Sequence, residues 1–192
     1  MREKDRLREQ LRRERRAHVE SLPAQTRALI FRRPPAAVAQ RIPAGATVGI
    51  YAESAFEAPA SGYGRWLAEE GHVVALPWFA ARGANMEFRL WANPHDDDEL
   101  VTGPDGIRQP PANAPLASPS VVFVPLVGFT AEGYRLGQGA GHYDRWLAAH
   151  PGTLAIGLAW DCQLREALPF ESHDVALDTV VTPTRLYQGD RS

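Results

Sequence analysis

The sequence predicts an α/β fold with three layers: a mostly parallel β-sheet that has helices on both faces and is preceded by an N-terminal helical hairpin. Short, almost continuously apolar runs, typical of strands buried on both faces, alternate with longer segments that repeat at helical spacing. The composition is that of an ordinary folded domain, because 44% of the 192 residues are hydrophobic and 23% are charged. We therefore expect one domain that spans residues 1–192.

Residues 1–33 form a basic arm that is predicted to be helical. They contain 11 Lys and Arg against 5 Asp and Glu, whereas the rest of the chain contains 10 against 18. No Gly or Pro occurs from Glu3 to Ser21, apolar residues recur there at helical spacing, and a second helical segment is expected over 24–33. We expect the arm to pack on the α/β body. Its positive charge favours binding of a polyanionic ligand, either a nucleoside triphosphate or a nucleic acid. A solvated amphipathic helix without a ligand would have the same composition.

The remaining elements follow from apolar runs and from the residues that interrupt them. A helix is expected from a cap at Ser61 to Gly71, and another over 142–150. Pro77 is expected to end the second strand, and the Pro- and Gly-rich stretch 103–119 is expected to be a surface loop. Strands are predicted over 47–51, 72–76, 86–91, 120–125 (the most apolar, at the sheet centre), 153–159 and, last in the chain, 176–181.

Cysteine content and hydropathy exclude two classes of protein, those held together by internal disulfides and those that span a membrane with a helix. Cys162 is the only cysteine, so no disulfide forms within the chain, and we interpret this residue as a buried apolar side chain. The apolar runs are far shorter than the about 20 residues that a membrane-spanning helix needs. No secretory leader is recognisable, and we expect a soluble, cytoplasmic protein.

A glycine-rich loop between the central strand and the helix at 142–150 is the candidate site. Gly137, Gly139 and Gly141 alternate there, so that backbone N–H groups can approach a phosphate, and the following helix N-terminus favours anions. Ligands of such sheets bind beyond the carboxyl ends of the strands, where this loop is expected. Arg135 is placed to neutralise phosphate charge, and Asp144, in the first helical turn, is either a capping carboxylate or a metal ligand.

The full string ArgLeuGlyGlnGlyAlaGlyHisTyrAspArg, residues 135–145, resembles a motif of the 5-formyltetrahydrofolate cyclo-ligase family, also called methenyltetrahydrofolate synthetase. Further matches follow in the family's order over nearly the whole chain: Lys4-x-x-Leu7-Arg8, Tyr51 to Glu57, Leu76-Pro77, Met86 to Phe88, Gly106-Ile107, Val124-Pro125 and residues 168–178. The chain departs from the family's usual residues at Gln109, Leu126, Thr130, Ala140 and His142.

The resemblance implies a fold of the NagB/RpiA/CoA-transferase type and an ATP-dependent reaction. In that reaction Mg-ATP phosphorylates the formyl oxygen of 5-formyltetrahydrofolate, N10 attacks the formyl carbon, and 5,10-methenyltetrahydrofolate, ADP and phosphate are formed. The implied partners are ATP and the folate, with or without a polyglutamate tail, and the implied metal is Mg²⁺. Neither nucleic acid nor a membrane is implied, and we expect a monomer.

The resemblance also implies roles for individual residues. Lys4 and Arg135 are implied as catalytic, and Asp144 and Asp174 as ligands of Mg²⁺. ATP contacts are implied for Lys4, Arg8, Arg135, Leu136, Gly137, Gln138, Gly139, Ala140, Gly141, His142 and Tyr143. Folate contacts are implied for Ala52, Glu57, Gln138, Gly139, Ala140, Gly141 and His142.

Simpler structural interpretations exist for several of these residues. Lys4 alone suggests a frayed terminus, Asp174 a turn residue bonded to its own backbone, and Glu57 a solvated loop acid. His142 and His173 suggest a metal pair, yet single histidines are more often packed or on the surface.

Two other functions fit parts of the sequence. One is a diverged nucleotide-binding regulatory module without turnover. The other is an RNA-binding protein that uses the basic arm, which is disfavoured because residues 1–30 contain no Phe, Tyr or Trp for base stacking.

The single lysine gives a direct test of the arm. Lys4 is the only lysine, so an amine-directed reagent modifies only this side chain and the α-amino group. If Lys4 contacts phosphates, saturating Mg-ATP protects it from acylation, whereas a frayed terminus is labelled equally with and without nucleotide. Mass spectrometry of the N-terminal peptide measures the difference. Unchanged labelling would remove Lys4 from the site.

Overall fold

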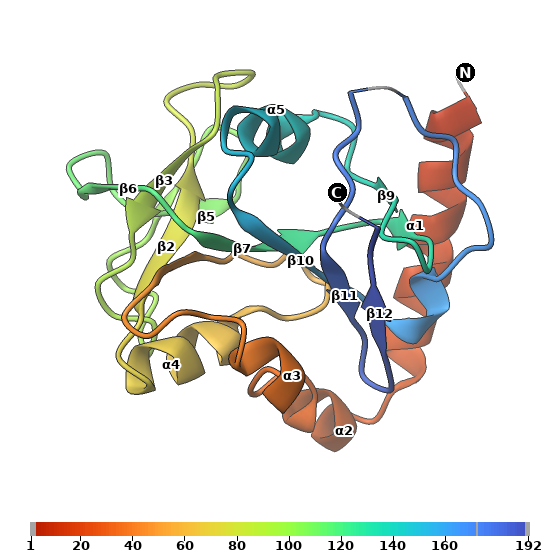
Figure 1. Cartoon of the computed structure of the whole chain (residues 1–192), viewed down its shortest axis with the longest axis horizontal. Helices are drawn as coiled ribbons and strands as arrows, with labels where there is room; N and C mark the ends of the chain where they lie inside the picture. Colours follow the sequence, from red (N-terminus) through yellow and green to blue (C-terminus); the bar gives the residue numbers. More distant parts are fainter. Residues whose placement is uncertain (1–2, 172, 191–192) are drawn as a thin grey trace.

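The computed structural model describes residues 3–171 and 173–190 and is built on an eight-stranded sheet (Figure 1). Five of its strands run parallel: β1 (Thr47–Gly49), β2 (Val73–Trp78), β7 (Val121–Pro125), β10 (Leu154–Leu158) and β11 (Thr179–Val181). Antiparallel strands extend both edges: β3 (Glu87–Leu90), β6 (Leu116–Ala117) and β12 (Leu186–Gln188). The order β12-β11-β10-β7-β1-β2-β3-β6 confirms the predicted mostly parallel sheet, with β7 at its centre.

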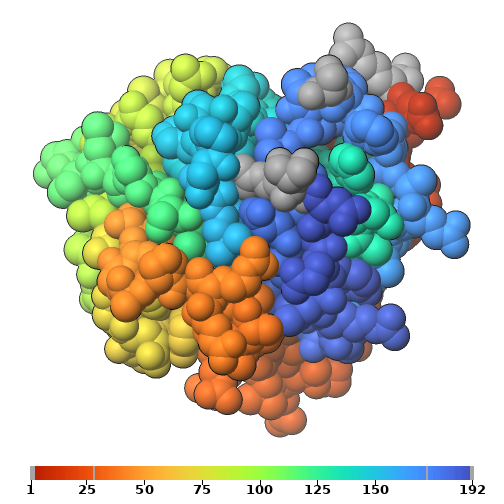
Figure 2. Space-filling view, viewed as in Figure 1, coloured from red at the N-terminus to blue at the C-terminus, as the bar shows by residue number. Residues whose placement is uncertain are grey.

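Helices cover both faces of the sheet, as predicted. α5 (His142–Ala149) lies on one face, and the other carries α2 (Ala24–Leu29), α3 (Ala36–Ala39) and α4 (Ser61–Glu69) (Figure 1). The long α1 (Glu3–Ser21) stands at the side and packs on a 3₁₀ turn, η1 (Asp161–Gln163). Figure 2 shows the red N-terminal end of α1 beside the blue C-terminal part of the chain. Within the described ranges, no helix is both long and apolar enough to cross a membrane.

The central strand β7 contributes to the core on both of its faces, because successive side chains of a strand point in opposite directions. Phe123 packs with α4, where its ring meets Tyr63 edge to face at 5.2 Å. Val124, its neighbour, packs with Trp146 of α5 in a second cluster. Residues 121–124 are all buried, which explains why this run is the most apolar of the sequence.

The predicted helical segment 24–33 ends early, at Leu29. Ile30 is extended, and Phe31 has φ = 58°, in the left-handed region. This turn buries the Phe31 ring against Tyr63 and Trp160. The helix expected over residues 30–33 is therefore wrong, because burial of a large aromatic ring outweighs continued helical hydrogen bonding.

Three further boundaries differ from the predictions. Ser61 is the first residue of α4 and not its cap, since Ala60 precedes the helix without a side-chain cap bond. Pro77 lies inside β2, where β1 pairs only as far as Ala75, so no strand on that side needs the N–H that proline lacks. β11 is not the last strand, because β12 follows it as an antiparallel hairpin.

The predicted surface loop 103–119 contains short strands. β5 (Arg108–Gln109) pairs with β4 (Val101–Thr102), and β6 joins the sheet beside β3. Most residues of the segment are exposed, as expected, but Gln109 and Pro110 are buried.

A buried glutamine ties together two loops that follow the central strands. Gln163 donates from Nε2 to the carbonyl oxygens of Leu126 (2.8 Å) and Val127 (3.0 Å), which come after β7. Its Oε1 accepts the N–H of Trp160, after β10, at 2.8 Å. The glutamine thereby satisfies buried backbone groups that strand pairing does not reach.

We expect Gln163→Ala to lower the free energy of unfolding by about 3 kcal/mol, because it leaves buried backbone groups unpaired and opens a cavity. Urea denaturation followed by tryptophan fluorescence measures the change. Gln10→Ala, at an exposed position of α1, is the matched control and should stay within about 0.5 kcal/mol of the parent protein. Equal effects of the two substitutions would contradict the bridging role.

Candidate functional site

The alternating glycines form a loop that connects β9 (Arg135–Leu136) to α5. β9 pairs with β8 (Gly128–Phe129) in a short hairpin beyond the end of β7. Gly139 and Gly141 have φ values of 112° and 65°, a region that favours glycine, and Gly141 directly precedes α5. A Cβ atom on Gly139 would lie 3.5 Å from Cζ of Arg8. The loop and α1 are therefore in close contact.

Two cavities adjoin this loop and share part of their walls. The smaller one has a volume of about 290 Å³, and the larger one about 700 Å³, so both are of a size that binds small molecules. Arg135, Gly137, Gly141 and Asp144 line both of them. Ligands in the two cavities would meet at these four residues.

Arg135 is the buried cation at this shared wall. Its Nη2 lies 2.6 Å from Oδ1 of Asp144, and its Nη1 donates to the carbonyl oxygen of Val175. The same Asp144 oxygen accepts the N–H of Val175 at 3.1 Å. Burial lowers the pKa of the Arg135 guanidinium, and the Asp144 carboxylate opposes that shift. Asp144 is therefore not a helix cap: it is the counter-charge of a buried arginine.

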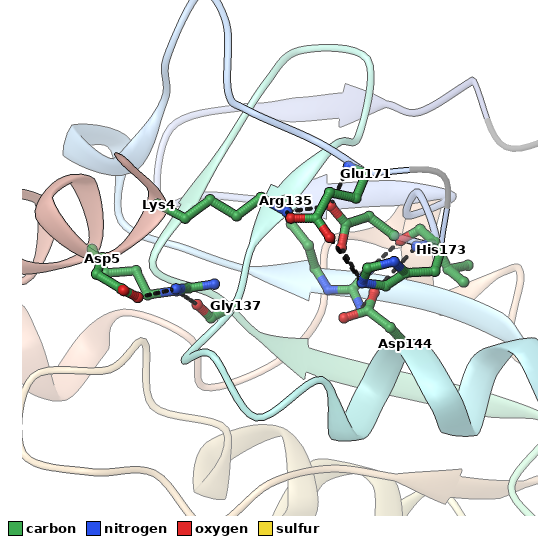
Figure 3. Close-up of polar contacts among 10 residues, drawn as sticks. Lys4, Asp5, Arg135, Gly137, Asp144, Glu171 and His173 are labelled. Atoms are coloured by element: carbon green, nitrogen blue, oxygen red, sulfur yellow. Dashed lines mark hydrogen bonds and ion pairs between the residues drawn. The ribbon is translucent and has the colours of Figure 1, made fainter. Parts of the chain in front are cut away.

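A second charge cluster lies in the larger cavity, where α1 meets the segment after Pro169 (Figure 3). Lys4 Nζ lies 2.9 Å from Asp174 Oδ2 and 3.2 Å from Glu171 Oε1. Partial burial lowers the pKa of Lys4, but the hydrogen bonds to the two carboxylates outweigh it, so the pKa is raised. Partial burial likewise raises the pKa of Asp174, but the bond from Lys4 prevails and lowers it. Lys4 is thus held in place and is not part of a frayed terminus.

Two arginines of α1 hold the glycine loop. Arg8 donates from Nε to the carbonyl oxygen of Gly137 at 3.0 Å. Arg12 bonds both the carbonyl oxygen (3.0 Å) and the side-chain oxygen (2.7 Å) of Gln138, whose Nε2 in turn donates to Glu57 at 2.7 Å. Arg12 was not predicted as a site residue, although its spacing of four from Arg8 places both on one helix face.

The smaller cavity has mainly apolar walls with a few polar groups. Tyr51, Met86 and Ile107 line it, together with Tyr143. The Tyr143 hydroxyl is buried and has no hydrogen-bond partner among residues 3–171 and 173–190, and burial raises the pKa of this phenol above its ordinary value. A ligand with a flat, largely apolar ring system and a few polar atoms suits such a cavity.

The predicted site residues divide between the two cavities. Lys4, Arg8, Leu136, Gly139 and Asp174 line the larger cavity, and Ala52, Glu57, Gln138, Ala140, His142 and Tyr143 line the smaller one. The two histidines that suggested a metal pair are also divided, since His142 lines the smaller cavity and His173 the larger one.

One departure from the family pattern, Gln109, also lines the smaller cavity. Its side chain bonds both backbone groups of Phe79, at 3.1 Å and 3.2 Å. His142 packs on the Phe79 ring with a centroid distance of 4.7 Å. Burial and the nearby Arg145 lower the pKa of His142. These two residues thus shape one wall of the smaller cavity.

The residues present fit a magnesium ion that arrives with phosphates. Asp144 and Asp174 both line the larger cavity, and the hydrogen bonds that each accepts from described residues go to one oxygen, Oδ1 of Asp144 and Oδ2 of Asp174. Oδ1 of Asp174 lies 3.7 Å from Nε2 of His173. Within residues 3–171 and 173–190, this cavity included, no three His, Cys, Asp or Glu side chains are grouped to hold a metal. Mg²⁺ typically takes one or two carboxylates and completes its shell with phosphate oxygens and water.

Comparison with known proteins identifies a matching family and several relatives. The sequence model of the 5-formyltetrahydrofolate cyclo-ligase family matches residues 1–183. The Escherichia coli (strain K12) protein named 5-formyltetrahydrofolate cyclo-ligase is 41% identical over 105 residues, which covers 52% of this chain and 58% of the relative. The Mycolicibacterium smegmatis protein of the same name is 34% identical over 124 residues, which covers 62% of this chain and 64% of the relative. The chain thus spans less than two thirds of the length of these curated relatives.

Solved structures show the same fold. The NMR structure of Aquifex aeolicus 5,10-methenyltetrahydrofolate synthetase has a TM-score of 0.66 at 23% identity, and covers 98% of this chain and 94% of its own. A 5,10-methenyltetrahydrofolate synthetase from Mycoplasma pneumoniae has a TM-score of 0.66 at 20% identity. The alignment covers 93% of this chain and 98% of that protein's chain. These similarities confirm the predicted fold.

The ion pair at Lys4 predicts its acid–base behaviour. Because the pKa of Lys4 is raised above 10.5, its acylation should reach half of the maximal rate at a pH above that value. Asp174→Asn removes a negative charge and should shift this midpoint to lower pH, since the ammonium form is less stabilised. The matched control is Asp5→Asn, because Asp5 pairs with Arg8. Labelling followed by mass spectrometry from pH 8 to about pH 11.5 compares the three profiles. A midpoint that does not move in Asp174→Asn would show that the pair does not form in solution.

Proposed function

The chain belongs to the 5-formyltetrahydrofolate cyclo-ligase family, and we propose that it converts 5-formyltetrahydrofolate to 5,10-methenyltetrahydrofolate while ATP becomes ADP and phosphate. The observation that carries this proposal is the pair of adjoining cavities with Arg135, Gly137, Gly141 and Asp144 in common. A reaction between two bound substrates requires such a shared wall. We further propose that the protein acts as one domain, as a monomer and in the cytoplasm.

The nucleotide is proposed to bind in the larger cavity. Lys4, Arg8 and Arg135 supply positive charge there, and the glycine loop offers backbone N–H groups beside the N-terminus of α5. In the structure Lys4 is paired with Asp174 and Glu171. A phosphate oxygen would compete with these carboxylates for the ammonium group, so nucleotide binding exchanges one anionic partner of Lys4 for another.

The folate is proposed to bind in the smaller cavity. Its apolar walls suit a pterin ring, and Glu57 and the backbone near Ala52 offer acceptors for the ring N–H groups. The Glu57–Gln138–Arg12 chain of hydrogen bonds holds the Glu57 carboxylate in position. The formyl group would then lie toward the shared wall, where the γ-phosphate arrives.

The chemistry has two steps that the residues can assist. The formyl oxygen attacks the γ-phosphorus as ADP leaves, and N10 then attacks the formyl carbon, after which the C–O bond breaks, phosphate departs and N10 loses its proton. Transfer of a phosphoryl group depends mostly on positioning and on charge stabilisation. Arg135, fixed by Asp144 and Val175, is a preorganised cation at the point where negative charge accumulates. Asp144 and Asp174 would hold Mg²⁺, which shields the phosphate charges when bound.

The proposal is tested by a coupled measurement of activity. Purified protein should form the methenyl product, followed by its absorbance, only when both Mg²⁺ and ATP are present, and ADP should appear in equal amount. Equal rates with EDTA or without ATP would contradict the proposal. Binding of ATP without release of ADP in the presence of 5-formyltetrahydrofolate would favour a regulatory module instead.

A substitution at Asp144 separates its two roles. Asp144→Asn should lower the turnover rate at least about tenfold, because an amide is a poorer ligand of Mg²⁺ than a carboxylate. It should also lower the free energy of unfolding by about 3 kcal/mol, because Arg135 loses the counter-charge of a buried ion pair. Turnover is measured below the unfolding temperature of the variant. Asp97→Asn, on an exposed turn, is the matched control and should change neither quantity. Full turnover of folded Asp144→Asn protein would remove Asp144 from the metal site.

A further inference from the structure

One aromatic side chain of the larger cavity is exposed to an unusual degree. Phe170 lines this cavity, and 62% of its surface is accessible, although Phe is among the most buried residue types. One face of its ring stacks on Tyr134, with ring centroids 4.9 Å apart and an angle of 23° between the planes. The stacked pair holds the ring in a defined orientation while most of it remains open to solvent.

The position of Phe170 relative to the charged residues is equally informative. Glu171, the next residue, lies 3.2 Å from Lys4, so the ring is adjacent to the charge cluster that is proposed to hold phosphates. Most of the other residues that line this cavity are charged or are glycines, and Leu136 is itself buried in a core cluster. Phe170 therefore gives a mostly polar cavity of about 700 Å³ one accessible flat apolar surface.

We propose that Phe170, supported by Tyr134, is the surface on which the base of the bound nucleotide stacks. This inference rests on the proposed function, in which the larger cavity takes ATP. A nucleoside triphosphate has one highly charged part and one flat aromatic part, and the cavity presents a matching surface for each. Aromatic side chains stack on nucleobases through their faces, which requires a ring that is held still and exposed on one side.

If Phe170 stacks on the base, the basic arm and Phe170 bind the same ligand. The charges of Lys4 and Arg8 act on the phosphates, whereas Phe170 acts on the base, so the two ends of one ligand are contacted by segments far apart in the sequence. Phe170 is thus a binding residue and not a catalytic one, and its loss should affect the affinity for nucleotide far more than the turnover number.

The test compares Mg-ATP with Mg-tripolyphosphate, which carries the same phosphates and no base. Isothermal titration calorimetry on the full chain should show that Phe170→Ala weakens Mg-ATP binding about tenfold and leaves the Kd of Mg-tripolyphosphate unchanged. Phe170→Trp keeps a flat ring and should retain the preference for Mg-ATP. Leu116→Ala, at a position of similar exposure (65%) on β6, is the matched control and should change neither constant. Thermal unfolding of each variant verifies that it is folded.

Several results would overturn the inference. Equal weakening of both ligands in Phe170→Ala would show that the ring only supports the fold of the phosphate site. A raised KM for 5-formyltetrahydrofolate with an unchanged KM for ATP would assign the ring to the folate. Parent protein that binds Mg-ATP and Mg-tripolyphosphate equally would show that the base makes no contact. Absence of binding by either ligand would instead reject the proposed function, and with it this inference.

Discussion

The buried ion pair between Arg135 and Asp144 is the interaction on which the rest of the site depends. A guanidinium cannot give up its proton in a protein, so a buried one needs a counter-charge and hydrogen-bond acceptors. Asp144 from α5 and the carbonyl oxygen of Val175 provide them. The pair thereby joins the β8–β9 hairpin, the start of α5 and the segment that carries Asp174. The glycine loop lies between the two partners in the chain, and its ends are fixed by this pair.

Basic residues of the arm form a second set of contacts that organise the site. Lys4, Arg8 and Arg12 each contact a different part of the site. Lys4 contacts Asp174, Arg8 contacts the carbonyl oxygen of Gly137, and Arg12 contacts Gln138. Surface ion pairs contribute little to stability, but the contacts of Lys4 and Arg8 are partly buried, whereas those of Arg12 are exposed. α1 is anchored to the body by Leu11 and Val19, which are buried, so the basic residues project from a fixed support. The charges of Lys4 and Arg8 are therefore directed toward the larger cavity, and Arg12 binds Gln138 at the wall of the smaller one.

Much of the fold could be predicted from the sequence because strands and helices here follow their hydrophobic periods. The run 121–125 is apolar at every position since both of its faces are covered, and α1 has no breaker for 19 residues. Errors occurred where tertiary contacts override local rules. Phe31 leaves the helix for the core, and Pro77 is tolerated in β2 because the neighbouring strand has already ended. In the site, Gly137 to Asp144 form one motif in the sequence, whereas Arg12, Gln109 and Phe170 lie outside this motif and reach the cavities only through tertiary packing.

The sequence by itself determined the family, the order of the elements and the residue types that a phosphate-binding loop needs. These properties depend on residues that are close together in the sequence, so they can be predicted without knowing which distant segments are in contact. The tertiary structure decided which charges are partners. Lys4 and Asp174, 170 positions apart, form an ion pair, and Asp144 serves Arg135 where the sequence left open a helix cap or a metal ligand. It also decided that the loop adjoins two cavities and that an exposed aromatic ring lies in one of them. The physical reason is that electrostatic and stacking contacts depend on separations of a few ångströms between segments whose approach is set by packing of the whole sheet.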